Sequence, residues 1–399
     1  MESKMAYPGF FMNGLNMTAV HHMRFSVRNS LAWLLLLCTV VLGLSACVQV
    51  GEEKSSGAAK KFVWPAPPEE PRFAYERSIY GSDDVIGASE DSAMKLLLTG
   101  EQRTSLGFKK PYGVAVNRGR VFVSDTADMV VKVFDVPESK YFTIGDSEKL
   151  DLNQRLVKPI GISVDGSGNL YVADASTKFI MVYDRDGAFL RKFGGEGSFD
   201  RLASVTVDKK GERAYAVDIG GADSMKHRIR VFDAQTGKHL LDIGRQRGSG
   251  EGELNLPRAV AIGKDNKIYV VDSGNFRIQV FDAEGKFLKT FGSIGKQGGN
   301  FARPKEASVD AEGNLYVIDA AFGNFQIFDP EGQLLLAVGG RSEGDMPGGF
   351  ALPAGIWVDE DGRIYVTDQI FKKVDIFRPF KLSEKTGFLV KQKTEPPKK

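Results

Sequence analysis

Between residues 106 and 378 the chain alternates short apolar runs with polar turns rich in Asp, Gly and Asn. The stretch from 259 to 291 shows the pattern most clearly, with runs at 259–262, 267–271, 277–281 and 286–291. Many residues of these runs are β-branched or aromatic, which is the composition of β-strands. Gly in the turns supplies the positive φ that tight hairpins need. The pattern therefore predicts four antiparallel strands joined by short turns.

This four-strand pattern occurs six times along the chain. In each copy the second run ends in Asp, at Asp125, Asp174, Asp218, Asp272, Asp319 and Asp368. An aromatic residue followed by Asp closes the third run, and these pairs recur at intervals of 49, 49, 49 and 47 residues between Phe134 and Phe328. Repeats of this length with four strands are typical of propeller blades. We therefore predict an all-β fold, a six-bladed β-propeller of four-stranded antiparallel blades, over residues 73–380.

The sixth copy has only three runs and ends at Arg378, without the usual Asp. Residues 73–80 have the composition of an outer strand, and we predict that they pair beside residues 374–377 and close the ring. Closure removes an open sheet edge that would otherwise template aggregation. A short helical stretch near residues 93–98 is expected to lead into the first blade. The Lys-rich tail, 381–399, is expected to be loosely packed.

Residues 270–282 read Val-Val-Asp-Ser-Gly-Asn-Phe-Arg-Ile-Gln-Val-Phe-Asp. This string resembles the NHL repeat, in which a leading Pro-x-Gly is followed by Tyr-Val-Ala-Asp-Ser-Gly-Asn and Arg-Ile-Gln-Val-Phe-Asp. The resemblance covers roughly residues 106–378 and implies a propeller of the same kind. The third copy departs from the pattern, because Leu202 replaces the leading Pro and an insertion lies around residues 220–225.

The N-terminal region has the features of an export signal. Residues 31–44 are apolar and follow Arg24 and Arg28, but the run is short for a membrane-spanning helix. It ends in Leu-Ser-Ala-Cys47, which resembles the lipobox of bacterial lipoproteins. That resemblance implies a signal peptide over residues 1–46, cleavage before Cys47 and lipidation of its thiol. Met23 offers a second start, from which the signal would have normal length.

The resemblance to lipoproteins also implies a place in the cell. Val48, in the position where Asp retains such proteins in the inner membrane, favours the outer membrane of the cell envelope. Residues 47–72 are polar and then Pro-rich, which predicts a tether between the lipidated cysteine and the propeller. A Pro-rich segment before an NHL-type propeller resembles bacterial lipoproteins that accompany exported multihaem cytochromes. We therefore expect membrane attachment through the N-terminal lipid and protein partners in the envelope, such cytochromes among them.

Composition and charge exclude several function classes. The chain has 399 residues, is 42% hydrophobic and carries a net charge of +2. Residues 1–46 hold three basic residues and one acidic residue, so the remainder is neutral and no nucleic-acid partner is expected. Both cysteines, Cys38 and Cys47, lie in the first 50 residues, which excludes an internal disulfide framework. Only His227 and His239 lie in the propeller region, so a three-His zinc site is excluded, and both are expected at the surface.

Comparing the six copies with one another points to a candidate binding site. The leading Pro-x-Gly motif opens each inner strand near the mouth of the central channel, and blades four and five depart from it with Arg258, Lys305 and Glu306. Together with Tyr112 of the first blade, these residues are predicted to bind an anion, a carboxylate or a peptide end at the channel mouth. The alternative is a local salt bridge that lines a solvated funnel. The six aspartates are interpreted as loop caps, because a device repeated in every blade indicates a structural role.

These observations favour an exported, lipid-anchored propeller that serves as a protein- or ligand-binding scaffold, with no catalytic residue and no cofactor. No nucleophile elbow is present in the sequence, and the one cysteine retained after cleavage would be lipidated. The alternative is a metal-dependent hydrolase or lyase with its site in the central channel near Glu306. Propellers of the lactonase and paraoxonase type hold calcium with channel Glu, Asn and Asp, a set that Glu306 alone does not reproduce.

Overall fold

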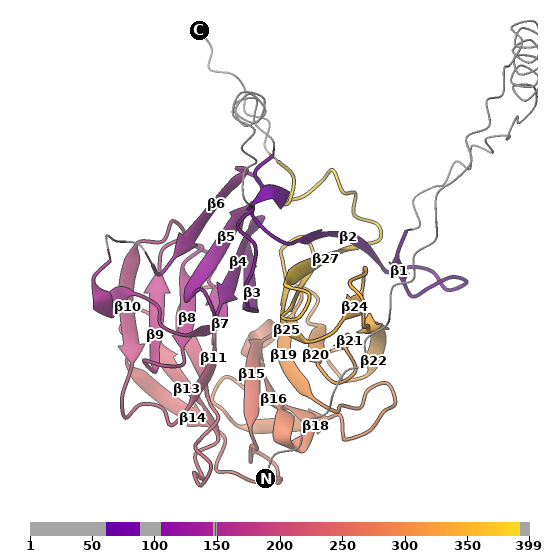
Figure 1. The fold of residues 1–399 in the computed structure, drawn as a ribbon. Helices are drawn as coiled ribbons and strands as arrows, with labels where there is room; N and C mark the ends of the chain where they lie inside the picture. Colours follow the sequence, from indigo (N-terminus) through magenta and orange to yellow (C-terminus); the bar gives the residue numbers. More distant parts are fainter. Residues whose placement is uncertain (1–60, 88–104, 147, 149, 392–399) are drawn as a thin grey trace, which may run out of the picture. The chain divides into compact units, whose positions relative to one another are not determined.

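The computed structural model describes residues 61–87, 105–146, 148 and 150–391. In this part of the chain, six antiparallel sheets surround a common centre, as Figure 1 shows. The first strand of each sequence repeat lies innermost in its sheet, and each inner strand contacts the inner strands of the two neighbouring sheets. The fold is a six-bladed β-propeller, as the repeats predicted.

The blades follow one another in chain order. The first contains β3 (Pro111–Asn117), β4 (Arg120–Asp125), β5 (Val130–Asp135) and β6 (Lys140–Ile144). The second contains β7 (Pro159–Val164), β8 (Leu170–Asp174), β9 (Phe179–Tyr183) and β10 (Phe189–Gly194). The third contains β11 (Leu202–Val207), β12 (Arg213–Asp218), β13 (Arg228–Asp233) and β14 (His239–Ile243).

The remaining blades have the same plan. The fourth contains β15 (Pro257–Ile262), β16 (Ile268–Asp272), β17 (Arg277–Phe281) and β18 (Phe287–Phe291). The fifth contains β19 (Pro304–Val309), β20 (Leu315–Asp319), β21 (Asn324–Phe328) and β22 (Leu334–Val338). The sixth contains β25 (Pro353–Val358), β26 (Ile364–Asp368), β27 (Lys373–Pro379), β2 (Phe73–Ile79) and β1 (Val63–Trp64). The loops hold a two-stranded ladder, β23 (Gly340–Arg341) with β24 (Gly349–Phe350), and four 3-10 turns, η1 (Ser82–Asp84), η2 (Leu152–Gln154), η3 (Lys264–Asn266) and η4 (Ser273–Asn275).

A buried aspartate at the end of the second strand fixes each blade to the loop that leads into its inner strand. In the second blade, Asp174 Oδ2 accepts the backbone N–H groups of Val157 at 2.6 Å and Lys158 at 3.0 Å. Its Oδ1 accepts those of Ser176 and Thr177, both at 3.0 Å, in the turn that follows. The equivalent side chains are Asp125, Asp218, Asp272, Asp319 and Asp368, all fully buried. The interpretation of these residues as loop caps is confirmed.

The ring closes through a strand from the N-terminal side of the propeller. β2 pairs antiparallel with β27, with Tyr75 opposite Phe377, and supplies the outer strand that the sixth copy lacks. Two polar contacts reinforce the ladder: Arg363 Nε lies 2.9 Å from Glu76 Oε2, and Ser78 Oγ donates to Asp375 Oδ1. The predicted closure is confirmed, and it leaves neither end of the blade series with an unpaired edge at this junction.

One further strand comes from the segment that we assigned to the tether. β1 pairs with β2, and the Trp64 ring meets the Phe377 ring edge to face with centroids 5.3 Å apart. Residues 63–72 therefore pack on the sixth blade, and the tether cannot extend through them. The sequence did not predict this strand, because only two residues pair and the flanking prolines are typical of an extended linker.

Six hydrophobic clusters hold the blades together, and each cluster is shared by two neighbouring blades. The cluster between blades six and one also contains Leu389, which is buried. Nearby, the Phe388 N–H donates to Asp361 Oδ2 at 2.6 Å, and Arg363 Nη2 donates to the Thr386 carbonyl at 2.9 Å. The expectation of a loosely packed tail is therefore wrong for this stretch, because an apolar residue near its end completes the interface between two blades.

Several expectations fall outside the described residues. These are the signal peptide, the lipidated Cys47, the first part of the tether and the helical stretch near residues 93–98. Within the described ranges, no helix has the length and apolar character needed to cross a membrane.

Replacing Asp174 with Ala should destabilise the propeller by about 3 kcal/mol or more, because up to four backbone N–H groups then lose their acceptor in a buried site. The free energy of unfolding in urea measures the effect. Asp184→Ala is the matched control, because Asp184 caps a surface hairpin by accepting the N–H groups of Asp186 and Ala188. The control should cost less than about 1 kcal/mol, and equal losses in the two variants would contradict the structural role of the buried cap.

Candidate functional site at the mouth of the propeller

The six inner strands begin on one face of the propeller, which we call the mouth face. Because the strands of each blade are antiparallel, the loops between successive blades lie on this face. The turns between the second and third strands lie there as well. The opposite face carries the other hairpin turns. The candidate residues from the sequence all lie at the start of inner strands and therefore on the mouth face.

Neighbouring inner strands approach each other closely where they begin. A Cβ atom added to Gly113 would lie 2.8 Å from the carbonyl oxygen of Ile160. A Cβ atom added to Gly355 would lie 2.6 Å from the carbonyl oxygen of Tyr112. A side-chain hydroxyl bridges the latter pair, because Thr367 Oγ1 donates to the Tyr112 carbonyl at 2.7 Å and accepts the Gly355 N–H at 2.8 Å. The third residue of the leading motif is therefore small for a steric reason.

Glu306 occupies this third position in the fifth blade, where the other blades have Gly, Ser or Ala. Its Oε1 accepts the backbone N–H of Ala307 at 3.2 Å. Burial raises the pKa of the Glu306 carboxyl to about 8, although the Ala307 N–H and the Lys305 ammonium both act to lower it. At neutral pH the carboxyl is therefore largely protonated and can donate a hydrogen bond.

Lys305 and Tyr112 meet across the ring. The Lys305 Nζ atom of blade five lies 4.9 Å from the centroid of the Tyr112 ring of blade one, within the range of a cation–π interaction. Ala354 holds the equivalent position in the intervening sixth blade. Burial lowers the pKa of Lys305 to about 8; the neighbouring Arg303 and Arg258 contribute to the fall, and Glu306 opposes it.

The same charges act on Tyr112. Burial raises the pKa of its hydroxyl, Glu306 raises it further, and Arg258 and Arg303 counteract this rise. The structure thus brings the sequence-predicted residues Tyr112, Lys305 and Glu306 together and places the exposed Arg258 within electrostatic range of them. Cys47, the remaining predicted site residue, lies outside the described residues.

Arg303 is a site residue that the sequence analysis missed. It immediately precedes the leading Pro of the fifth blade, and its charge influences both Lys305 and Tyr112. A signal for it exists in the sequence, because the residue before the leading position is also basic in blades one, two and three, as Lys110, Lys158 and Arg201. We define the mouth cluster as Tyr112, Arg258, Arg303, Lys305 and Glu306.

The mouth cluster is suited to an anion. Within the described ranges none of its cations forms an ion pair, so the alternative of a local salt bridge with Glu306 does not apply there. The described residues also contain no group of three His, Cys, Asp or Glu side chains placed to hold a metal ion. The positive neighbours of Glu306 oppose a cation there by charge repulsion, so the residues present do not fit calcium.

The expectation that His227 lies at the surface is wrong. Its side chain is 1% exposed, and Nδ1 accepts the backbone N–H of Leu256 at 2.9 Å. Leu256 precedes the inner strand of the fourth blade, where Asp272 accepts the N–H of Asn255 and His227 accepts the next one, which the aspartate accepts in other blades. His227 thereby links blade three to blade four. His239 is exposed as expected, and its Nε2 atom lies 2.7 Å from Asp242 Oδ1.

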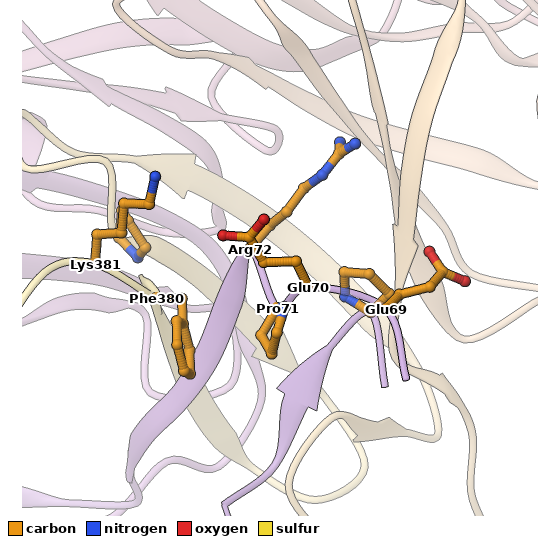
Figure 2. Close-up of a pocket in the computed structure, with 8 residues that line it drawn as sticks. Glu69, Glu70, Pro71, Arg72, Phe380 and Lys381 are labelled. Atoms are coloured by element: carbon orange, nitrogen blue, oxygen red, sulfur yellow. The ribbon is translucent and has the colours of Figure 1, made fainter. Parts of the chain in front are cut away.

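The hollows described in this structure lie away from the mouth cluster. One, of about 570 Å³, lies beside the end of β27, where Pro71 and Phe380 stand between Lys381 and Glu69, as Figure 2 shows. Another, of about 350 Å³, lies between turns of blades five and six on the opposite face. The second hollow is lined by several carboxylates, among them Asp359, whose pKa burial raises to about 6. Neither hollow gathers several cations as the mouth does, so the mouth cluster remains the candidate site for an anion.

Comparison with known proteins supports the reading of the repeats. Residues 254–281, which include β15, β16 and β17, match the NHL repeat family. The fourth blade is thus similar to an NHL repeat. Mouse NHL repeat-containing protein 3 is 25% identical over 213 residues, which cover 49% of this chain and 58% of the mouse protein. The B-box type zinc finger protein ncl-1 of Caenorhabditis elegans is 30% identical over 137 residues, which cover 34% of this chain and 15% of the worm protein.

The chain spans 58% of the mouse relative's length and 15% of the worm relative's. Among solved structures, a gluconolactonase from Xanthomonas campestris aligns with a TM-score of 0.51 and 16% identity, covering 76% of this chain and 98% of that protein. At this identity the likeness concerns the propeller fold alone.

The pH dependence of Lys305 reactivity should reveal the effect of the neighbouring charges on its pKa. Competitive labelling with trace acetic anhydride, followed by mass spectrometry, should show Lys305 titrating near pH 8. Arg303→Ala should move this midpoint upward, because it removes a positive neighbour, and Glu306→Gln should move it downward, because it removes the opposing carboxyl. The exposed Lys209 serves as the internal reference for reagent concentration. Shifts of the Lys305 midpoint in the opposite direction in both variants would contradict the proximity of Arg303 and Glu306 to Lys305.

The bond between His227 and Leu256 should make stability depend on pH. Burial lowers the pKa of His227, the Arg247 and Arg201 guanidiniums lower it further, and Asp218 and Asp272 oppose them. The unfolded chain therefore binds the proton more tightly, so this contribution is complete above about pH 6.5 and is lost as the pH falls below that value.

Urea unfolding of wild type and of His227→Asn between pH 7.5 and pH 5 tests this, in a range around the ordinary histidine pKa of about 6.5. The Asn Oδ1 atom can accept the Leu256 N–H but does not titrate, so the variant should lose less stability at acid pH than wild type does. An equal acid loss in both proteins would show that His227 does not control it.

Proposed function

We propose that this chain is an exported, lipid-anchored propeller that acts as a binding scaffold and holds an anionic group of its ligand at the mouth cluster. The observation that supports the proposal most is that Arg258, Arg303 and Lys305 converge at the mouth without an ion-pair partner among the described residues. Gathering like charges around the half-buried Lys305 costs free energy, and a bound anion offsets that cost.

The chemistry of the cluster favours a carboxylate. The Lys305 ammonium and the Arg258 guanidinium would pair with its negative charge, and the protonated Glu306 carboxyl would donate a hydrogen bond to one oxygen. The Tyr112 ring would form an apolar wall beside the bound group. The side chain of Asp or Glu, or the end of a peptide, supplies a group of this kind.

The anchor and the location are proposed from the sequence. The apolar run at 31–44, the Leu-Ser-Ala-Cys47 string and Val48 support lipidation of Cys47 and residence in the outer membrane of a bacterial envelope. In that setting the partner would be another envelope protein, and the Pro-rich segment before the propeller favours exported cytochromes among them. A rigid propeller with variable loops is a suitable platform for such recognition.

A metal-dependent hydrolase is the less favoured candidate. The Xanthomonas gluconolactonase shares only the fold with this chain, and fold likeness does not transfer chemistry. Near Glu306 the charges of Arg258, Arg303 and Lys305 would repel a metal ion rather than help to hold it. Binding of an anion agrees better with these residues.

Cross-linked affinity purification from membranes, with a tag after Lys399, tests the proposal. Wild type should capture a stoichiometric partner that Arg258→Ala/Lys305→Ala loses, because the double variant removes both charges offered to the partner. Lys209→Ala/Lys286→Ala, two exposed lysines on the opposite face, is the matched control and should retain the partner. In the same experiment Cys47→Ala should move the chain from the membrane fraction to the soluble fraction.

Recovery of the propeller without a partner from both wild type and the mouth variant would contradict the scaffold proposal. Membrane retention of Cys47→Ala would contradict the lipid anchor.

A further inference from the structure

The mouth cluster is part of a larger ring of positive charge. The residue just before the leading position is basic in four blades, and the second residue of the motif is basic in two. We define the basic ring as these six side chains, Lys110, Lys158, Arg201, Arg258, Arg303 and Lys305. They come from blades one to five, whereas the sixth blade has Leu352 and Ala354 at the two positions. The ring thus extends around most of the mouth.

The fold fixes the backbone of the ring. The N–H groups of Lys110, Lys158, Arg201 and Arg303 each donate to the buried aspartate of their own blade at 2.9 to 3.0 Å. Their side chains are nevertheless exposed. The backbone of these four residues is therefore held beside the start of an inner strand, and their side chains project from fixed points on the mouth face.

The charges of the basic ring are not used inside the described part of the molecule. None of the six side chains forms an ion pair there, although other cations do: Lys132 pairs with Asp128 at 2.6 Å, and Arg277 pairs with Asp272 at 2.8 Å. Glu306 follows the ring's Lys305 in the chain, and its raised pKa leaves it largely uncharged at neutral pH. The positive charges of the ring therefore have no direct ion-pair partner within the described residues.

Exposed apolar side chains surround the ring. More than half of the exposed large hydrophobic residues of the described chain lie in loops of the mouth face: Tyr80, Leu106, Met129, Leu152, Val157, Met225, Ile294, Met346 and Ile370. The hairpin turns of the opposite face carry none, and the exposed Phe380 and Phe388 belong to the C-terminal segment. Exposed apolar residues, methionine in particular, are features of protein-binding surfaces.

Together these features distinguish between two kinds of polyanion. A single-stranded nucleic acid would use the cations and would gain from exposed aromatic rings on which its bases stack. At the mouth the Tyr112 ring is covered by Lys305, and the exposed large apolar residues around it are aliphatic or Met apart from Tyr80, whereas Phe276, Phe322 and Phe371 are half-buried. An acidic protein segment uses both features, because its carboxylates pair with the cations while its apolar side chains contact the loops.

We propose that the mouth face docks an acidic segment of a partner protein, whose carboxylates pair with the basic ring and whose apolar side chains contact the surrounding loops at Met129 and Ile370. This inference rests on the proposed function, because it assigns the chemistry of the partner to the scaffold. It extends the site from one anionic group at Lys305 to several carboxylates distributed over five blades. The apolar contacts set the preference for a protein over other polyanions.

Fluorescence anisotropy with the full chain tests the inference with three labelled probes of equal net charge. The probes are a peptide alternating Glu and Leu, a peptide of Glu and Gly, and an oligothymidylate. The Glu-Leu peptide should bind most tightly, and binding should weaken as salt rises. Lys158→Glu/Arg303→Glu should weaken both peptides on the order of tenfold, whereas Lys209→Glu/Lys286→Glu on the opposite face should change neither.

A second pair of changes isolates the apolar contribution. Met129→Ser/Ile370→Ser should weaken the Glu-Leu peptide and leave the Glu-Gly peptide unchanged, because only the former has apolar side chains to lose contact. Tighter binding of the oligothymidylate than of the Glu-Leu peptide would overturn the inference. So would equal effects of the charge reversals on the two faces.

Failure here is distinguishable from failure of the proposed function. If membranes yield a partner that depends on Arg258 and Lys305 while neither peptide binds, the scaffold stands and the acidic-segment inference falls. If the Glu-Leu peptide binds through the basic ring but membranes yield no partner, the docking chemistry stands and the proposed envelope scaffold falls.

Discussion

Every blade depends on one interaction: a buried carboxylate at the end of the second strand that accepts backbone N–H groups of the loop ahead of the inner strand. A loop between blades would otherwise leave these donors without partners, at a cost that a buried site does not tolerate. By holding the loop, the aspartate also sets where the inner strand begins. Each sheet contacts only its two neighbours, and these loops therefore set the position of each sheet relative to the next around the ring.

The same constraint places the candidate site. Since the aspartates fix the loop just ahead of every inner strand, substitutions at the positions beside that loop project from the mouth without disturbing the core. Glu306 shows the limit of this freedom, because it stands where other blades need a small residue for the close approach of inner strands. Its burial keeps the carboxyl largely protonated and leaves the neighbouring cations free to meet an external anion.

Ring closure follows a different physical rule from the blades themselves. A blade is built from local hairpins, whereas the last outer strand comes from the other end of the propeller and joins β27 through β2. The contacts of Glu76 with Arg363 and of Ser78 with Asp375 connect residues nearly three hundred positions apart. Closure is therefore the most non-local step of folding, and it completes the core between blades five and six with Trp64 and Phe73.

The sequence by itself determined the six blades, their strands, the caps and the closing strand, because these depend on local alternation and on a repeat that can be compared with itself. It also predicted Tyr112, Arg258, Lys305 and Glu306 as departures from that repeat. Only the tertiary structure showed that Lys305 of the fifth blade contacts Tyr112 of the first, and that Arg303 affects the pKa of both. It also showed that His227 is buried and that Leu389 packs between two blades. Burial, pairing and pKa depend on which residues of different blades meet in space, and a periodic pattern along one chain does not contain that information.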